Sequence, residues 1–400
     1  MVFANRVKNI QESPTALITA KAIQMKRDKI DIVDLTIGEP DFPTPQNIKA
    51  AGKNAIDRDL IKYTMVRGML ELRQAIAQKL QNENGVVYHA DEIIVTNGAK
   101  QAILNTILTL IDRGDEVIIP APYWVSYPEM VTLAEGKAVI VPTREADGFK
   151  LTAENLRAVI SPKTKAIILC NPSNPTGALY TRNELDALAA VIIESDLFVI
   201  ADEIYEKLVY DTTPFVSFPA VHPALKQKTI LINGFSKAYA MTGWRLGYAA
   251  GAREVIETTV KIQSHSTTNA STIAQYAGIE ALNGPQEDIE HMRRLFEERR
   301  NFMHSRLSAM KGISCQKPGG AFYAFPNVAA YYGSTYQGTQ INNSSDIALY
   351  LLNEAKVLLI PGVAFGSDDH LRISYSSSME RLEEGMQRME NALGNLLGGR

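Results

Sequence analysis

The sequence has little of what marks secreted and membrane proteins. Its 400 residues include only two cysteines, Cys170 and Cys315, which are too few and too far apart for a disulfide framework. We therefore expect both thiols to be reduced and buried. No apolar run approaches the ~18 residues of a membrane span, and residues 1–6 lack the apolar region of a signal peptide. These features predict a cytoplasmic protein that does not contact a membrane.

Charge and motif content exclude further classes. The net charge is -3 and no basic stripe stands out, so we expect no nucleic-acid partner. The six histidines show no paired ligand spacing and the His-Glu-x-x-His motif is missing, which argues against a metal site. The sequence also lacks the Gly-x-Gly-x-x-Gly motif and a P-loop, so nothing in it indicates a nucleotide enzyme.

The chain is rich in hydrophobic residues, and short hydrophobic segments recur along it. Of its residues, 46% are hydrophobic, which is enough for a large core, and the length suggests about two to three domains. Short apolar runs alternate with helical patterns over residues 91–251, which predicts an α/β fold with a mostly parallel sheet flanked by helices. Loops at the carboxyl ends of such strands lie on one side of the sheet, where ligands collect.

The remaining segments predict a second, smaller domain. We expect a large domain over residues 46–285, and a smaller α+β domain built from the N-terminal segment 1–45 and from residues 286–400. A long polar helix over residues 287–310 would link the two. Its arginines are expected to form a solvated helix face: Arg293, Arg294, Arg299 and Arg300.

Lys237 is the first candidate for chemistry. It follows the apolar run 229–232, and Arg245 stands a short way further along the chain. A primary amine at the carboxyl end of a buried strand, followed by a guanidinium, is what pyridoxal phosphate needs: the amine for a Schiff base and the guanidinium for the phosphate. Alone the motif is weak, because most lysines are solvated surface residues.

A carboxylate stands at the end of another expected strand. Asp202 follows the apolar run 197–200, and Tyr205 comes about one helical turn later. Pyridoxal phosphate withdraws electrons only while its ring nitrogen carries a proton, and an adjacent carboxylate holds that proton in place. A phenol can hydrogen-bond the ring oxygen of the same cofactor. The alternative is that Asp202 simply caps a helix.

Asn174 lies in a loop that follows a third apolar run, 166–170. Two prolines in this loop fix the backbone, so the amide can be held still beside a ligand. An ordinary turn is the alternative. However, Asn174, Asp202 and Lys237 are spaced by about 30 residues, which is one strand–helix–strand unit in each interval. This spacing favours a shared site at one edge of the sheet.

Two more strand ends carry small or aromatic residues. Gly98 and Ala99 follow the run 93–96 and open a helical pattern, where unpaired N–H groups and the positive helix end suit a phosphate. Trp124 follows a further strand and could stack on a flat cofactor ring. The alternatives are a tight turn at Gly98 and a plain core position for Trp124.

Taken in order, these segments resemble the pyridoxal phosphate-dependent aminotransferases of fold type I, class I, and among them the aspartate/prephenate branch. The resemblance runs from about Arg6 to the C-terminal helix. It implies an enzyme that moves an amino group between aspartate or glutamate and 2-oxo acids such as oxaloacetate and 2-oxoglutarate, and that also converts prephenate to arogenate. The catalytic residues it implies are Lys237, as Schiff-base lysine and proton shuttle, with Asp202 and Tyr205.

The resemblance also implies the cofactor contacts. They are Gly98, Ala99, Lys100, Trp124, Asn174, Asp202, Tyr205, Lys237, Arg245 and Tyr63. Of these, Tyr63 matches a tyrosine that reaches the cofactor phosphate of the neighbouring subunit, so we expect a homodimer. The chain departs from many relatives at Gly234, where they have a serine. Ser236 stands beside the lysine instead, which leaves a serine contact to the phosphate open.

Substrate contacts follow from the same resemblance. Arg372 matches the arginine that grips the α-carboxylate, for which a planar fork suits better than an ammonium. Lys100 is implied for the distal carboxylate. The full implied set is Gly38, Trp124, Asn174, Arg372, Lys100, Thr15 and Gln11. In this branch a lysine associated with prephenate use stands where this chain has Gln11, which can donate a hydrogen bond but supplies no charge.

Two alternatives remain at this stage. The first is another enzyme of the same fold and cofactor, such as an aromatic or alanine-type aminotransferase or a carbon–sulfur lyase, since Lys237, Asp202 and Arg372 are common to those. The second is a non-catalytic regulator that kept the fold. Such regulators carry an additional DNA-binding segment, for which we expect no room ahead of Arg6.

Overall fold

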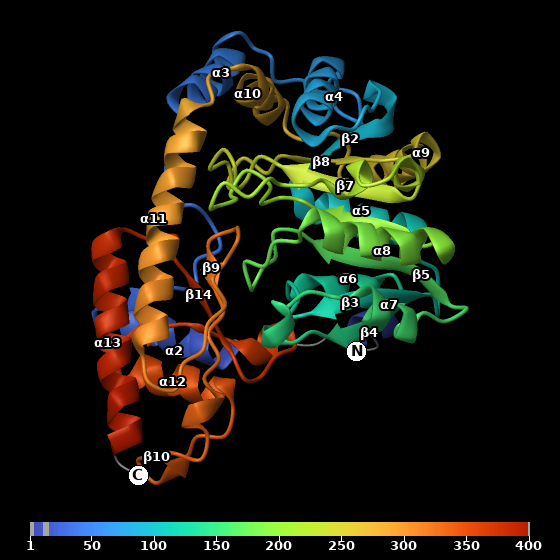
Figure 1. The fold of residues 1–400 in the computed structure, drawn as a ribbon. Coiled ribbons are helices and arrows are strands. Elements are labelled where there is room, and N and C mark those ends of the chain that lie inside the picture. Colours follow the sequence, from blue (N-terminus) through green and yellow to red (C-terminus); the bar gives the residue numbers. More distant parts are fainter. Residues whose placement is uncertain (1–3, 11–15, 399–400) are drawn as a thin grey trace.

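A computed structural model describes residues 4–10 and 16–398 of the chain. Its centre is a seven-stranded sheet (Figure 1). In spatial order the strands are β2 (Ile93–Thr96), β8 (Gly247–Ala250), β7 (Thr229–Gly234), β6 (Phe198–Asp202), β5 (Thr164–Cys170), β3 (Glu116–Ala121) and β4 (Lys137–Pro142). β8 runs antiparallel to both of its neighbours, and the other neighbouring pairs are parallel. The predicted α/β fold with a mostly parallel sheet is confirmed.

Helices lie over both faces of this sheet and beyond its β2 edge (Figure 1). They are α3 (Gln46–Asp57), α4 (Leu70–Asn84), α5 (Ala99–Leu110), α6 (Ser126–Leu133), α7 (Ala153–Val159), α8 (Arg182–Glu194), α9 (Arg253–Ser264) and α10 (Thr272–Asn283). On β5, Ile167 and Leu169 pack with α7 and α8, whereas Ala166 and Ile168 pack with α5, α6 and α9. Alternate side chains of a strand point to opposite faces, so a strand buried on both sides reads as a continuous apolar run.

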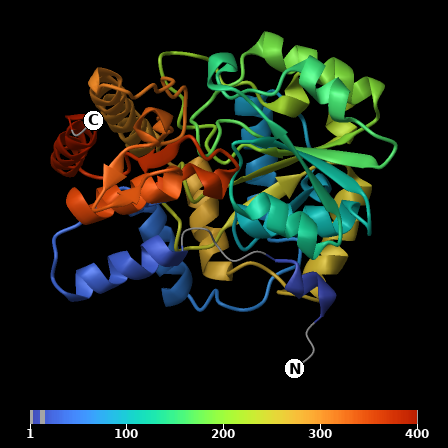
Figure 2. The same cartoon turned by 90° about the horizontal axis from the view of Figure 1, so that it is seen from below.

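The other elements lie beside the sheet and come from both ends of the chain. They are α2 (Ala16–Arg27), β1 (Val33–Asp34), α11 (Glu287–Ala309), β9 (Tyr323–Ala324), β10 (Thr335–Tyr336), β11 (Thr339–Gln340), α12 (Ser344–Glu354), β12 (Val357–Leu358), β13 (Ile360–Pro361), β14 (Leu371–Ser374) and α13 (Met379–Gly398). α1 (Asn5–Lys8) precedes them. β1 pairs in parallel with β12, which joins the two ends of the chain in one small sheet. Figure 2 shows α2 beside the C-terminal elements and apart from the central strands.

Short 3-10 helices complete the described elements: η1 (Ala90–Glu92), η2 (Glu145–Asp147), η3 (Phe218–Ala220), η4 (Pro223–Gln227), η5 (Ala329–Tyr331) and η6 (Gly362–Phe365). In the described part of the chain, none of the helices combines the length and the apolar character that crossing a membrane requires. The domain limits at residues 45/46 and 285/286 stay a prediction.

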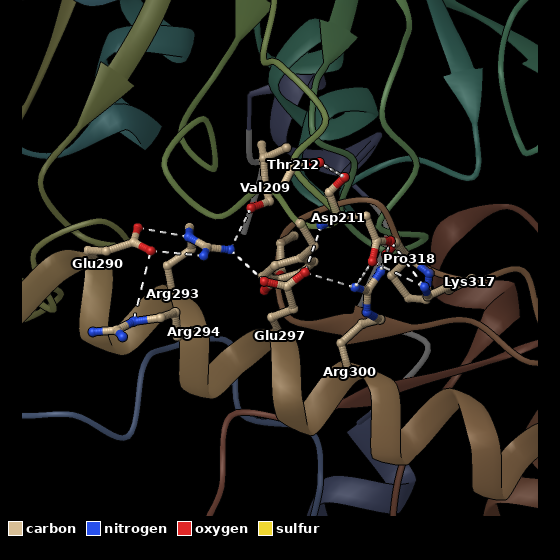
Figure 3. Close-up of polar contacts among 12 residues, drawn as sticks. Val209, Asp211, Thr212, Glu290, Arg293, Arg294, Glu297, Arg300, Lys317 and Pro318 are labelled. Carbon is tan, nitrogen blue, oxygen red and sulfur yellow. Dashed lines mark hydrogen bonds and ion pairs between the residues drawn. The ribbon is translucent and has the colours of Figure 1, made fainter.

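The long helix α11 corrects one expectation. Arg294 is exposed, but Arg300 has no exposed surface and Arg299 is 9% exposed, so the expected solvated face is wrong for these two. Figure 3 shows the reason for Arg300: α11 runs past a loop of the sheet, and both terminal nitrogens of Arg300 bind the Asp211 carboxylate at 2.8 Å. One of them also donates to the Pro318 carbonyl at 2.8 Å. α11 is therefore tied to two loops by buried guanidinium contacts.

Candidate active site

A cavity of about 620 Å³ opens at the carboxyl ends of β3, β5, β6 and β7. Two further segments close it, residues 37–39 and β14. Its lining consists of Ile37, Gly38, Glu39, Ala99, Lys100, Ile103, Trp124, Val125, Tyr127, Cys170, Asn174, Asp202, Ile204, Tyr205, Ser236, Lys237, Thr242, Arg245, Tyr323, Ile360, Phe365 and Arg372. The carboxyl edge of a parallel sheet is where ligands bind in such folds. Most of the residues singled out from the sequence meet here.

Lys237 lies just beyond the end of β7 and is largely buried. Its ammonium donates a hydrogen bond to the carbonyl of Gly38 and lies 5.8 Å from the centre of the Tyr205 ring. Burial, and next the positive charge of Arg372, lower the pKa of Lys237 to about 8. Both effects disfavour the charged form of an amine. A large share of this amine is therefore neutral in mildly alkaline solution.

Asp202 ends β6 and is 4% exposed. Its Oδ2 accepts a hydrogen bond of 2.6 Å from the Tyr127 hydroxyl, and Oδ1 accepts a longer one of 3.3 Å from the Ile204 N–H. Burial raises the pKa of this carboxyl, while the bond from Tyr127 and the charge of Lys237 act in the opposite direction. A buried carboxylate with these two donors is held in one orientation toward the cavity.

Tyr205 lies beside Asp202 on the cavity wall and is 3% exposed. Its hydroxyl is 2.9 Å from the hydroxyl of Tyr323, and the two rings meet edge to face. Burial raises the pKa of both phenols. Both hydroxyls therefore keep their protons at neutral pH and can donate hydrogen bonds.

Arg372 comes from β14 and closes the cavity from the side of the smaller sheet. Its Nη1 donates to the side-chain oxygen of Asn174 at 3.1 Å, and its Nη2 donates to the Thr36 carbonyl at 2.8 Å. The Nε is buried and has no hydrogen-bond partner among the described residues. A buried donor without a partner costs free energy unless a ligand satisfies it.

The start of α5 provides an anion site. Gly98 lies two residues after the end of β2, with a φ of 84° in the left-handed region, and α5 begins at Ala99. The first N–H groups of a helix have no acceptor within it and suit a phosphate. Arg245 reaches the same place, and a Cβ on Gly98 would come within 2.4 Å of its Nη2. Glycine is thus required both by backbone geometry and by the guanidinium.

Trp124 and Lys100 line the cavity next to each other. The Lys100 ammonium lies 4.8 Å from the centre of the Trp124 ring, within range of a cation–π contact. Burial, followed by repulsion from Arg245, lowers the pKa of Lys100. No carboxylate pairs with this ammonium among the residues that the structure describes. The amine is therefore available to an anionic ligand.

Two of the expected site residues that the structure describes, Tyr63 and Gly98, are not among the residues that line this cavity. Tyr63 is 89% exposed and does not line it. Gln11 and Thr15 lie outside the described residues. Glycine at position 234 has a packing reason, since a Cβ there would come within 2.9 Å of the Gly247 backbone. Ser236 lines the cavity instead.

Sequence reasoning missed other residues of the cavity. Tyr127 is three residues after Trp124, at the start of α6, and side chains three residues apart on a helical turn face the same side. This spacing could have revealed Tyr127 as a residue of the cavity. Tyr323 gave no local signal, because β9 meets the cavity only through pairing with β14. Glu39 and Thr242 were also missed; the Thr242 hydroxyl donates to the Glu39 carboxylate at 2.7 Å across the cavity mouth.

The residues present fit pyridoxal phosphate. Lys237 offers a largely buried amine, Asp202 a buried carboxylate for the ring nitrogen, and the start of α5 with Arg245 a cradle for the phosphate. Gly98 leaves open the space that a Cβ would take in that cradle. The unpartnered Nε of Arg372 marks a further place where a ligand atom is expected.

The fold and this grouping of amine, carboxylate and guanidinium are those of an aminotransferase. The chain belongs to the family Aminotransferase class I and II, whose model matches residues 30–389. This family uses pyridoxal phosphate. The predicted family is confirmed.

Similar proteins cover nearly the full length. The aspartate aminotransferase of Bacillus sp. (strain YM-2) is 44% identical, covering 97% of this chain and 98% of that protein. The probable aspartate/prephenate aminotransferase of Rickettsia bellii (strain RML369-C) is 46% identical, covering 99% of this chain and 100% of that protein. The crystal structure of the aspartate aminotransferase from Rhizobium meliloti matches with a TM-score of 0.97 at 42% identity, over 99% of this chain and 100% of that one.

Proposed function

We propose that this chain is a pyridoxal phosphate-dependent aminotransferase that moves an amino group between aspartate or glutamate and 2-oxo acids, including oxaloacetate and 2-oxoglutarate, and that also accepts prephenate. The observation that carries the proposal is the meeting of Lys237, Asp202 and Arg372 in one cavity. The names of the Bacillus and Rickettsia relatives support the choice of substrates.

Each part of the cofactor has a matching group. Bound pyridoxal phosphate supplies an electron sink that acidifies the proton on the α-carbon of an amino acid. In our proposal Asp202 holds the proton of the ring nitrogen, and the Tyr205 hydroxyl with the Asn174 amide donates to the ring oxygen. Trp124 stacks on the ring. The N–H groups at the start of α5, from Ala99 and Lys100, bind the phosphate together with Arg245.

Lys237 is the proton carrier in this proposal. Because burial and the charge of Arg372 lower its pKa to about 8, its amine can be neutral without strongly alkaline conditions. A neutral amine can accept a proton, and general bases work best when their pKa lies near the working pH. The Gly38 carbonyl accepts a hydrogen bond from the same amine and so helps to orient it.

Two cations of the cavity suit a substrate with two carboxylates. Arg372 would bind the α-carboxylate, with Nε as a donor that the protein leaves unused. Lys100 would bind the distal carboxylate, because its ammonium faces the cavity without a carboxylate partner among the described residues. An amino acid with only one carboxylate would leave Lys100 unpaired. The arrangement therefore favours aspartate and glutamate over apolar amino acids.

We also propose a homodimer in which Tyr63 reaches the phosphate site of the neighbouring subunit. Tyr63 is 89% exposed, and large apolar side chains near it are exposed as well, among them Ile61 at 56% and Met65 at 61%. Grouped exposed apolar residues mark interaction surfaces. We further propose a cytoplasmic location, with both cysteines as free thiols.

Transamination by the purified enzyme tests the function. Aspartate or glutamate would be the donor, with oxaloacetate, 2-oxoglutarate and prephenate compared as acceptors. Repeated turnover that depends on an acceptor is expected, whereas release of many equivalents of keto acid per enzyme without an acceptor would indicate a lyase. Efficient formation of arogenate would show that Gln11 suffices for prephenate.

Two substitutions separate the roles of the two cations. Lys100→Ala should raise KM for aspartate at least about tenfold, because one charge-assisted contact to the distal carboxylate is lost. The same variant should leave turnover of alanine unchanged. Arg372→Lys should weaken both substrates, because the α-carboxylate is common to them. Equal loss on aspartate and alanine in Lys100→Ala would refute its role at the distal carboxylate.

A further inference from the structure

Tyr323 touches two of the groups on which the proposed function depends. It lies on β9 and is 1% exposed. In the cavity wall it contacts Tyr205 on one side and Arg372 on the other. We propose that Tyr323 is a positioning residue, whose hydroxyl fixes the direction of the Tyr205 hydrogen bond and whose ring fixes the plane of the Arg372 guanidinium. This inference rests on the proposed function of the cavity.

The hydroxyl contact has a direction once a ligand is present. The two phenolic oxygens are 2.9 Å apart, and in the protein alone either of them can be the donor. A phenol has one proton to donate. If Tyr205 gives its proton to the ring oxygen of the cofactor, the shared hydrogen bond must be donated by Tyr323. Tyr323 would then leave Tyr205 free to act as a donor toward the cavity.

The ring contact holds the guanidinium. The Cζ of Arg372 lies 4.5 Å from the centre of the Tyr323 ring and 5.1 Å from the centre of the Phe365 ring. Guanidinium groups stack on aromatic faces, and the contact is stronger when both groups are out of water. The two terminal nitrogens are already bonded to Asn174 and Thr36. The rings thus constrain the direction in which the unpartnered Nε points.

β-sheet pairing makes the arrangement rigid. β9 lies next to β14 in the smaller sheet, with Tyr323 paired to Ser374, two residues from Arg372. The Tyr323 hydroxyl also approaches Gly38, where an added Cβ would lie 3.4 Å from it. One side chain therefore contacts the groups proposed for the cofactor ring and for the α-carboxylate.

A purely structural role is the alternative, since Tyr323 also packs against Phe322 in an aromatic cluster. Two substitutions separate the possibilities. Tyr323→Phe removes only the hydroxyl, and Tyr323→Leu removes the ring as well. Tyr350→Phe serves as the matched control, because Tyr350 is a buried tyrosine outside the cavity whose hydroxyl donates to a carbonyl at 2.7 Å.

The test measures two properties of each holoenzyme: the pH midpoint of its visible absorbance, and the affinity for succinate, a dicarboxylate without an amino group. Tyr323→Phe should raise the midpoint by about half a pH unit or more, which corresponds to the loss of one hydrogen bond. Without the Tyr323 hydroxyl, Tyr205 would be a weaker donor to the ring oxygen. More negative charge would then stay on that oxygen, and the cofactor would hold its proton to higher pH. Tyr323→Leu should also weaken succinate binding about tenfold, the loss of a buried cation–π contact. Tyr350→Phe should change neither.

The inference is overturned if Tyr323→Phe keeps the midpoint of the unmodified holoenzyme, or if Tyr323→Leu, folded as judged by its thermal transition, binds succinate as the unmodified protein does. A failure of the proposed function looks different. In that case the unmodified protein itself would show no visible absorbance with pyridoxal phosphate and no response to succinate.

Discussion

The hydroxyl of Tyr127 donates a hydrogen bond of 2.6 Å to Oδ2 of Asp202, and both side chains are buried. The bond joins the first turn of α6 to the end of β6. It supports the charged form of a carboxyl whose pKa burial raises. The first turn of α6 thus helps to keep Asp202 charged and oriented toward the cavity.

Removing that donor should affect both stability and activity. Tyr127→Phe leaves a buried carboxylate short of one hydrogen bond, so we expect the free energy of unfolding to fall by about 1–3 kcal/mol and kcat to fall as well. Urea unfolding and steady-state transamination measure the two effects. Tyr180→Phe is the control, because Tyr180 is also buried and hydrogen-bonded, to the Leu151 N–H, but does not line the cavity. A kcat equal in both variants would contradict the role of Tyr127.

The lowered pKa of Lys237 predicts how capture of the cofactor depends on pH. Only the neutral amine attacks an aldehyde, and the pKa of this amine is about 8 instead of 10.5. The rate at which the cofactor-free protein gains visible absorbance with pyridoxal phosphate should therefore rise as pH rises to about 8, and then level off.

Arg372→Met tests whether the charge of Arg372 contributes to the lowered pKa of Lys237. It removes a positive charge that lowers the pKa of Lys237, so the pH at which the rate levels off should move upward. A rate that keeps rising toward pH 10 in the unmodified protein would show that Lys237 titrates as an ordinary lysine.

Gly98→Ala should damage the phosphate cradle specifically. A Cβ at this position would lie within 2.4 Å of Arg245 Nη2, and the backbone φ is 84°. Displacing the guanidinium removes a charge-assisted contact, so we expect the Kd for pyridoxal phosphate to rise about tenfold or more. Gly85→Ala is the control: its φ is 70°, but nothing lies within 4 Å of the added atom. If both substitutions weakened pyridoxal phosphate binding equally, the cause would be backbone strain and not a clash with Arg245 in the cradle.

The buried guanidinium of α11 predicts a difference in stability between two arginines of one helix. Arg300 has no exposed surface and binds Asp211 through both terminal nitrogens, whereas the Arg294 side chain is 61% exposed (Figure 3). Arg300→Ala should lower the free energy of unfolding by about 3 kcal/mol. Arg294→Ala should change it by less than about 0.5 kcal/mol. Chemical denaturation of both variants measures this, and similar small effects would contradict the account of α11.

The central sheet and part of the cavity could be predicted because strand ends are local signals. Asn174, Asp202 and Lys237 each follow an apolar run, and parallel strands bring such ends to one edge. Arg372 came from the family resemblance alone. The functional roles of these residues stay predictions, although the structure gathers them in one cavity.

The parts that the sequence did not predict depend on contacts between distant segments. Tyr323 reaches the cavity through the pairing of β9 with β14, which no local pattern reveals. Arg300 looks like a solvated helix residue until the loop that carries Asp211 is placed over it. Helical periodicity describes one helix and carries no information on what packs against its polar side.

The most direct test of the account is the half-reaction of the holoenzyme with aspartate. The protein is saturated with pyridoxal phosphate, freed of excess cofactor and mixed with aspartate, and its visible absorbance is followed before and after addition of 2-oxoglutarate. We predict that aspartate changes the absorbance, that 2-oxoglutarate restores it, and that Lys237→Ala shows neither change. An unmodified holoenzyme that responds to no amino acid, or a Lys237→Ala variant that turns over like it, would contradict the account.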